Sequence, residues 1–458
     1  MNKSAFAFAR DLSETQFRPR IWLVRYQRHL LEPLLRHART QVPFYRDSGR
    51  FDPLFRSDDT IDWARWNEIP RLTRRELQQA GERLCAEAMP AEHGGTESYV
   101  TSGSSGEPVT VWHSHHFNPG VRTAVNLRNF DRHGIDPSQP LAFLYPFTPE
   151  DFDIRGIRRQ GTKIDRYSEA GLTGERFDVA DTRPPQELID TLVAIRPKFI
   201  RAQPIVLDMM CAYDRERRLS NLGVATVFAV GDHFPAEAKQ RVSEHLGCWI
   251  VDSYGSVECG RLANSCPHCD RYHVEAETVL LEVLGDDGLA AAAAEEGDVI
   301  ATPLHNYAMP LIRYDLDDRA IVGSQKQCSI TLPSLDEVFG RKRTLFVFGD
   351  GIAVAPLLPV SAIADFLGAQ AFQVAQVAPD RCEFRVVPGR KEWCDMRFEE
   401  MTELMRCMWW GSLQVEYRAV GSIPRNSRRA KLAAYVQELP RNSLPIPARV
   451  VTEAQNVV

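Results

Sequence analysis

Three segments carry residues whose types and spacing suit a nucleotide site. The first is the hydroxyl- and glycine-rich run TSGSSGEP at residues 101–108, which lies between apolar stretches. Glycines let a backbone curl until its N–H groups converge on an anion, and hydroxyls add further donors, so this run could bind a polyphosphate. It lacks the G-K-[ST] ending of the lysine-containing phosphate loop. On its own, the run fits an ordinary surface turn equally well.

The second segment, DSYGSVECG at residues 252–260, follows the apolar run CWIV. Ligands in open α/β sheets bind at the carboxyl ends of strands, so a strand ending here would place the segment at a binding edge. The ring of Tyr254 could stack on a base, and the carboxylate of Glu258 could bind Mg²⁺ through oxygen. The alternative is a turn in which Tyr254 packs in the core.

The third segment is IRYDLDDR at residues 312–319, followed at a distance by GRKR at 340–343. Its carboxylates could accept hydrogen bonds from ribose hydroxyls, as acidic residues do in dinucleotide-binding folds. Such a charged cluster taken alone is more often a solvated loop.

A cluster of cysteines predicts a metal site. Cys259, Cys266, Cys269 and His273 have the spacing C-x6-C-x2-C-x3-H. Three thiolates and one imidazole complete a tetrahedral zinc site and leave no open position, so we expect structural rather than catalytic zinc. It would hold the loop beside Tyr254 and Glu258. His268 is a competing ligand, and free thiols in a reducing compartment are the alternative.

The pattern of apolar residues divides the 458-residue chain into three regions. Residues 1–90 read as helical, with a capping box expected from Thr73 and Glu76. Residues 97–340 alternate apolar runs with helical stretches, which indicates an α/β sheet. Residues 345–458 read as a small α+β region. We therefore predict an α/β fold with a large N-terminal domain of layered sheets and helices over 1–340, and a small C-terminal α+β domain over 341–458.

The charge and the apolar runs of the chain argue against a nucleic-acid-coating protein and against a membrane protein. A net charge of −6 argues against a protein that coats nucleic acid. No apolar run reaches the ~18 residues that a membrane span needs, and charges follow the start of the chain too soon for a signal peptide, so we expect a cytoplasmic protein without a membrane partner. The basic helical region at 1–90 could form a homodimer or cover the sheet.

The order and spacing of these segments resemble the adenylate-forming superfamily of acyl-CoA synthetases, most closely its phenylacetate–CoA ligase branch. TSGSSGEPV resembles the phosphate-binding TSGTTGKP loop, DSYGSVECG the YGxTE motif, IRYDLDDRA the RYRTGD motif and GRKR the GRxDD hinge motif. VPFYR at 42–46 and IPRLT at 69–73 resemble N-terminal segments of that branch. The resemblance covers most of the chain, from about residue 30 to the C-terminal lysine region.

The resemblance implies a role for each matching residue. Lys431 would be the catalytic lysine, Tyr254 would pack on adenine, Glu258 would bind Mg²⁺ and Asp318 would hold the ribose. The remaining ATP- or AMP-binding residues would be Thr101, Ser102, Gly103, Ser104, Ser105, Gly106, Gly231, Asp232, Asp252, Ser253, Gly255, Ser256 and Arg341. Tyr145 and Phe147 would line the acid pocket, although buried strand-end residues are the simpler interpretation.

The resemblance implies a reaction that activates an aryl or small cyclic carboxylic acid with ATP, releases pyrophosphate and transfers the acyl group to CoA. Three departures weaken the second step: Glu107 replaces the lysine of the phosphate loop, Arg343 the hinge aspartate and Ala430 the glycine before the lysine. Transfer to an amine or to a carrier-protein thiol therefore stays open, as does an inactive relative that only binds a nucleotide.

Overall fold

The computed structural model describes residues 4–100, 109–136, 138–145, 157–160, 174–181, 183, 185–231, 234–324, 328–339, 346–349, 353–354, 363, 366–389, 396–408, 411–423 and 435–439. Their helices are α1 (Ala5–Thr15), α2 (Arg20–Gln41), α3 (Pro43–Ser48), α4 (Arg74–Ala80), α5 (Arg122–Arg132), α6 (Pro185–Ile195), α7 (Pro204–Tyr213), α8 (Ala236–Leu246) and α10 (Phe398–Met408).

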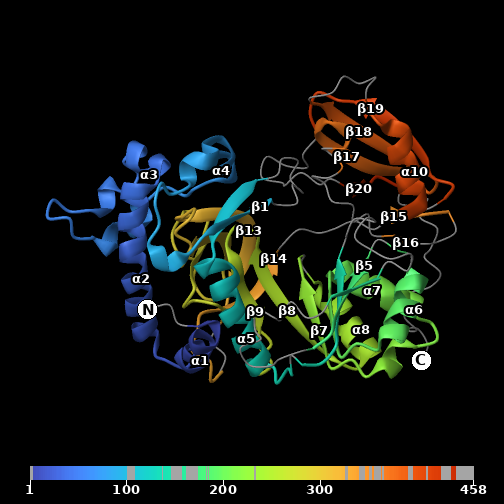
Figure 1. Ribbon diagram of the computed structural model, residues 1–458, viewed down its shortest axis with the longest axis horizontal. Helices are drawn as coiled ribbons and strands as arrows, with labels where there is room; N and C mark the ends of the chain where they lie inside the picture. Colours follow the sequence, from blue (N-terminus) through green and yellow to red (C-terminus); the bar gives the residue numbers. More distant parts are fainter. Residues whose placement is uncertain are drawn as a thin grey trace, which may run out of the picture.

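A 12-stranded sheet forms the centre of the molecule, with the spatial order β11-β12-β13-β14-β10-β9-β8-β7-β6-β3-β5-β4 (Figure 1). Its strands are β3 (Leu141–Tyr145), β4 (Ile157–Gln160), β5 (Arg176–Ala180), β6 (Phe199–Ala202), β7 (Thr226–Val230), β8 (Trp249–Ser256), β9 (Gly260–Ser265), β10 (Tyr272–Val274), β11 (Val279–Leu284), β12 (Glu296–Pro303), β13 (Tyr314–Val322) and β14 (Ser334–Phe339). β8 pairs in parallel with β7 and antiparallel with β9, so the sheet changes from parallel to antiparallel pairing there.

Helices cover both faces of the parallel half. Buried residues of α6, α7 and α8 form one apolar cluster with the strand residues Ala142, Leu144, Ile200 and Val227. On the opposite face, Phe130 of α5 packs against Phe228 of β7, with ring centroids 5.7 Å apart. Parallel strands covered on both faces are the arrangement that alternating strand and helix patterns predict.

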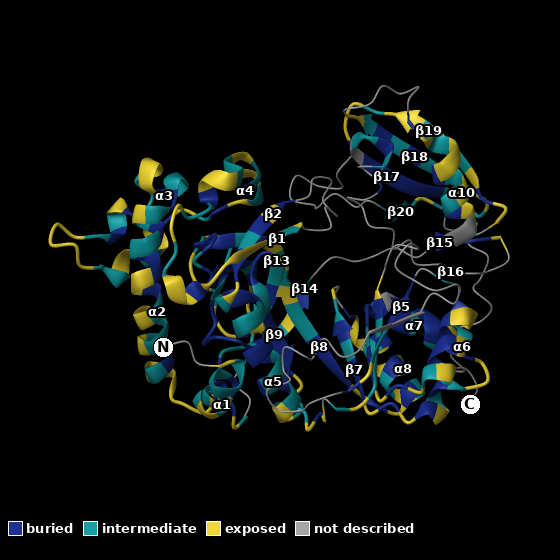
Figure 2. Ribbon diagram, viewed as in Figure 1, coloured by how far each residue is buried: buried dark blue, intermediate teal, exposed yellow. Residues whose placement is uncertain are grey.

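The N-terminal helices pack on the antiparallel half, where α2, α3 and α4 share one core with β9 to β14. The outer faces of these helices are exposed, while the strands behind them are buried (Figure 2). The predicted capping box is confirmed: the Thr73 side chain accepts from the Glu76 backbone N–H, and the Glu76 side chain accepts from the Thr73 backbone. This box fixes where α4 begins.

Smaller sheets complete the fold. β1 (Thr96–Val100) and β2 (Thr110–Ser114) form an antiparallel hairpin, and β15 (Phe346–Val347) pairs with β16 (Ala353–Val354). A 4-stranded sheet contains β17 (Ala369–Ala378), β18 (Arg381–Pro388), β19 (Gln414–Ala419) and β20 (Tyr435–Gln437). It shares an apolar core with α10, to which Met401 and Met405 contribute. The predicted α/β fold class is confirmed. No helix in the described ranges has the length and apolar character needed to cross a membrane.

Candidate active site

Two residues predicted to bind the nucleoside lie together. The hydroxyl of Tyr254 on β8 donates to Asp318 Oδ2 on β13 over 3.0 Å. β8 and β13 are four strand positions apart in the sheet. In a flat sheet the two strands would be roughly 19 Å apart, so a contact between their side chains requires a curled sheet. Burial, and then the nearby Asp318 carboxylate, raise the pKa of Tyr254 well above its usual value. The phenol therefore stays protonated and donates.

Glu258, the predicted Mg²⁺ ligand, is held by an arginine that the motifs did not indicate. Arg74 Nη1 lies 3.1 Å from Glu258 Oε1, and the two side chains are only 13% and 10% exposed. Arg74 is the first residue of α4, so the Thr73–Glu76 capping box determines its position. Tyr314 lies beside this pair, and its pKa is raised by burial and by the Glu258 carboxylate.

The chain before α4 is hydrogen-bonded to the third motif. The Leu72 N–H donates to the Arg313 carbonyl, and the Asp315 N–H donates to the Leu72 carbonyl, each over 2.9 Å. Arg71 Nη1 lies 3.0 Å from Asp298 Oδ2. The IPRLT and IRYDLDDR segments are thus adjacent in space, and the N-terminal region forms part of the same site.

The other residues of DSYGSVECG mainly hold β8 in place. Ser253 Oγ donates to Asn264 Oδ1 over 2.7 Å, and Ser256 Oγ accepts from the Cys259 N–H over 3.0 Å. A Cβ added to Gly255 would lie 2.6 Å from the Gly260 carbonyl oxygen, so only glycine fits there. Asp252 is buried and accepts from the Tyr272 hydroxyl. Its surroundings favour a structural role over the predicted nucleotide contact.

Several predicted residues lie outside the described residues: Thr101, Ser102, Gly103, Ser104, Ser105, Gly106, Phe147, Asp232, Arg341 and Lys431. β1 and β2 flank residues 101–108, with Val100 opposite Thr110 at the open end of their ladder. Gly231 directly follows β7, and its φ of +101° is a conformation that favours glycine. Tyr145 ends β3 with 45% of its surface exposed.

Three of the four predicted zinc ligands gather in one cluster with a fourth that was not predicted. Ligand atoms of Cys266, Cys269, His273 and Cys328 all lie within 4.8 Å of one another. The Cys266 and Cys328 sulfurs are 3.9 Å apart, and the Cys269 sulfur is 3.4 Å from His273 Nε2. Ideal tetrahedral zinc bonds would place two sulfurs about 3.8 Å apart and a sulfur and a nitrogen about 3.6 Å apart.

The surroundings of this cluster also suit a metal. His273 Nδ1 lies 3.2 Å from the Leu332 carbonyl, which orients the ring and leaves Nε2 free to ligate. The His268 backbone N–H points at Cys266 Sγ over 3.4 Å, while the His268 side chain is exposed.

Cys259, the fourth predicted ligand, is outside the metal-ligand group found in the described residues, which contains Cys328 instead. Cys259 lies before β9 and Cys266 lies after it. Six residues of extended strand span about 20 Å, so the two thiols are at opposite ends of β9. Cys328 reaches the cluster because the chain that follows it forms β14, which pairs with β10.

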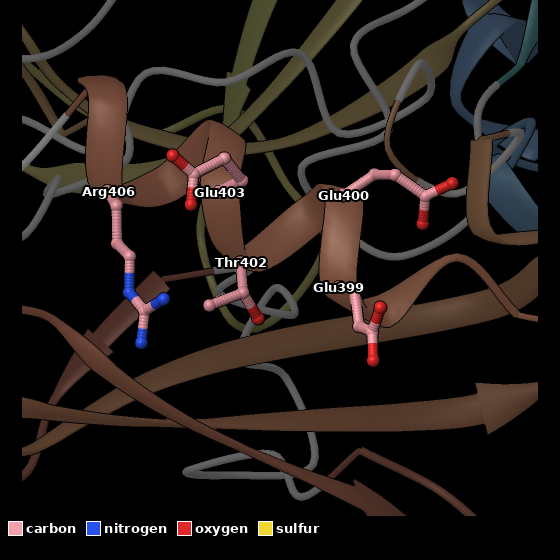
Figure 3. Close-up of a pocket in the computed structure, with 5 residues that line it drawn as sticks. All are labelled: Glu399, Glu400, Thr402, Glu403 and Arg406. Carbon is pink, nitrogen blue, oxygen red and sulfur yellow. The ribbon is translucent and has the colours of Figure 1, made fainter.

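A hollow on the C-terminal unit is a poor nucleotide site. Five side chains of α10 line it: Glu399, Glu400, Thr402, Glu403 and Arg406 (Figure 3). Three carboxylates on one open helix face would repel the phosphates of a nucleotide. We therefore place the candidate site at Tyr254, Asp318 and Glu258.

No protein-family profile matches the sequence, and no curated protein matches it. Solved structures of 2-hydroxyisobutyryl-CoA ligase do resemble the chain. The thioesterification state, in complex with 2-HIB-AMP and CoA, is 14% identical with a TM-score of 0.60 and covers 93% of this chain and 92% of that one. An open conformation with the same ligands is 17% identical, with a TM-score of 0.54 and coverages of 88% and 89%. The chain therefore has the fold of the adenylate-forming CoA ligases, as its motifs predicted.

Proposed function

We propose that the protein is an AMP-forming ligase that activates a carboxylic acid with ATP. The observation that carries this proposal is the 3.0 Å hydrogen bond between Tyr254 and Asp318, which brings two separate motifs to one place near the buried Glu258. The acid carboxylate would attack the α-phosphate of ATP, forming acyl-AMP and releasing pyrophosphate. The thiol of CoA would then attack the acyl carbon and release AMP.

The described residues would mainly bind and orient the nucleotide. The Tyr254 ring would pack on adenine, while its hydroxyl holds the Asp318 carboxylate in place to accept from a ribose hydroxyl. Positioning and charge stabilisation contribute most to reactions at phosphorus. Lys431 is proposed to stabilise the charge that develops between the carboxylate and the α-phosphate, carried by a mobile C-terminal domain over 341–458.

Glu258 fits the proposed magnesium site. It offers a carboxylate oxygen, which is the ligand class that Mg²⁺ prefers, and the guanidinium of Arg74 holds this carboxylate in place. A cation entering here would share Glu258 with Arg74. Bound Mg²⁺ would neutralise charge on the ATP phosphates.

Pyrophosphate exchange against a panel of carboxylic acids tests the proposal. We expect exchange that depends on both the acid and ATP, and Asp318→Asn should weaken it through the KM for ATP. Binding of ATP without exchange for any acid would contradict the proposal and favour a nucleotide-binding relative that is not an enzyme.

Mass spectrometry of the products identifies the acceptor. We propose an aryl acid and a CoA thioester, as in the phenylacetate–CoA ligase branch. Glu107, Arg343 and Ala430 favour a second candidate, transfer to an amine or a carrier-protein thiol. Reactions with and without CoA separate the two, because only the first yields a CoA thioester, while the second yields an amide or an acylated carrier protein.

We also propose that Cys266, Cys269, His273 and Cys328 bind a structural zinc ion. Four protein ligands fill a tetrahedral shell and leave no position for substrate. The ion would join the chain between β9 and β10 to the chain before β14. It would thereby stabilise the strands behind Tyr254.

A further inference from the structure

Gln203 has a buried side chain that the local structure does not use. It directly follows β6 and occupies the N-cap position of α7, where its carbonyl accepts from the Val206 and Leu207 N–H groups. Its side chain makes no capping hydrogen bond, although side-chain oxygens at this position commonly do. Only 5% of the residue is exposed. Helix formation therefore does not explain why an amide is buried here.

The amide oxygen of Gln203 also has no hydrogen-bond partner among the described residues. Burying an acceptor without a donor is unfavourable, so native proteins rarely do so. Gln376 shows the usual arrangement, since its oxygen accepts from the Val347 N–H over 2.9 Å and its nitrogen donates to the Val347 carbonyl over 2.8 Å. An acceptor left without a partner among the described residues suits a donor that arrives with a ligand.

Gln203 lies at the edge of the sheet where a bound substrate is expected. β6 lies between β3 and β7 in the sheet, so Gln203 lies at the carboxyl edge with Tyr145 at the end of β3 and Gly231 after β7. A Cβ built on Gly231 would be 3.8 Å from Gln203 Cγ, so the glutamine side chain lies against the backbone of that turn. The carboxyl edge of a parallel sheet is where ligands bind.

We propose that Gln203 selects the acid by accepting a hydrogen bond from it. This inference rests on the proposed adenylation and extends it to a substrate class: the acid carries a hydroxyl or amino group in addition to the carboxylate that reacts. A site built to pair with a polar substituent discriminates against an analogue that lacks it, because the protein acceptor is then left buried and unpaired.

A panel of matched acids tests this with the wild-type enzyme. Each set has one scaffold and carries a hydroxyl or amino group, a methyl group, or a methoxy group at the same position. We expect kcat/KM for pyrophosphate release to be at least about tenfold higher for the best donor-bearing acid than for its methyl and methoxy partners. Equal or better activity with the methyl or methoxy acids would overturn the inference.

Gln203→Met tests the residue itself, because it keeps a similar length and removes the acceptor. The donor preference should fall to within about threefold, with the KM for ATP unchanged. The control Gln240→Met alters an amide that donates to Glu244 on α8, and should keep the full preference. An unchanged preference in Gln203→Met would refute the role of Gln203. If Gln203→Met does not fold, Gln203→Glu serves in its place, because it keeps an acceptor. Gln203→Glu should retain the preference for donor-bearing acids. Loss of that preference in Gln203→Glu would also refute the role of Gln203 in selecting the acid.

Failure of the underlying function looks different. If no acid supports exchange with the wild-type enzyme, adenylation itself is wrong. Exchange without a preference for donor-bearing acids contradicts only the inference about Gln203.

Discussion

Arg74 and Glu258 form an ion pair of 3.1 Å although 184 residues separate them in the chain. Glu258 lies in the turn between β8 and β9, whereas Arg74 begins α4 in the N-terminal region. Both side chains are largely buried, so each charge depends on the other for compensation. The pair connects the N-terminal helices to the proposed magnesium ligand.

Arg74→Ala should destabilise the fold by about 3 kcal/mol, because it leaves the Glu258 carboxylate buried without its counter-charge. Urea unfolding measures the change. In a Glu258→Gln background the same substitution should cost at least about 1 kcal/mol less, since no charge is then left unpaired. As a control, Arg83→Ala removes an exposed pair with Asp47 and should cost less than about 1 kcal/mol. If Arg74→Ala lowered the free energy of unfolding equally in the wild-type and Glu258→Gln proteins, the result would contradict an interaction between Arg74 and Glu258.

Substitutions of Tyr254 separate its ring from its hydroxyl. Tyr254→Ala should raise the KM for ATP by roughly tenfold to a hundredfold, because stacking on a base is worth about 1–3 kcal/mol. Tyr254→Phe keeps the ring and should have a smaller effect on ATP, while losing about 1 kcal/mol of stability with the Asp318 hydrogen bond. Steady-state kinetics measures the KM for ATP, and thermal unfolding measures the change in stability. If alanine and phenylalanine raised the KM equally, stacking would not be the function of the ring.

The zinc content of variants tests whether Cys328, as the structure suggests, or Cys259, as the sequence spacing suggests, is the fourth ligand. Purified untagged protein should contain about one zinc per chain, and Cys328→Ser should lower this below one half, because an incomplete tetrahedral shell binds zinc less tightly. Cys259→Ser should leave the content unchanged, since Cys259 is outside the cluster. Elemental analysis of the three proteins makes the comparison. Loss of zinc from Cys259→Ser but not from Cys328→Ser would favour Cys259 as the fourth ligand.

The stability of the protein should fall below neutral pH because of His305. Its Nε2 lies 3.3 Å from the Glu277 carbonyl, and its ring is 5.6 Å from the His116 ring. Burial, followed by repulsion from His116, lowers the pKa of His305 to about 3. The unfolded chain binds this proton near pH 6.5, so between about pH 6.5 and 3 the unfolded state holds more protons and stability decreases as pH falls.

The contribution of His305 should approach about 1.4 kcal/mol per pH unit in this window. Unfolding at pH 7, 6 and 5 measures the slope, which should become shallower in His305→Gln. His29 lies on the exposed face of α2, so His29→Gln should keep the wild-type slope. An unchanged slope in His305→Gln would show that this histidine is not the titrating group.

Local patterns predicted the fold class and the capping box of α4, because hydrophobic periodicity and capping depend on neighbouring residues. The motifs also indicated Tyr254 and Asp318, whose contact the structure shows. Arg74 carried no comparable signal, since its role depends on the pairing of the Leu72 segment with β13. That pairing is a long-range contact, which no local pattern encodes.

The cluster of Cys266, Cys269, His273 and Cys328 shows the same limit. The CPHC sequence identified Cys266 and Cys269, which are close in the chain. The x6 spacing before Cys266 proved to be a strand, and Cys328 joins the cluster only through the pairing of β14 with β10. Gln203 was missed because nothing in RAQPIVL distinguishes a buried amide from an ordinary residue at a helix start.

The hydrogen bonds between the Leu72 segment and β13 bear on how far the chain can be shortened without losing the candidate site. A version that starts at β1 would leave the Arg313 carbonyl and the Asp315 N–H without their backbone partner, and it would remove the only arginine within the described residues that is paired with Glu258. The segment at 72–74 therefore forms part of the candidate site. A shortened chain must keep this segment, even though the motifs predicted to bind the nucleotide all come later in the sequence.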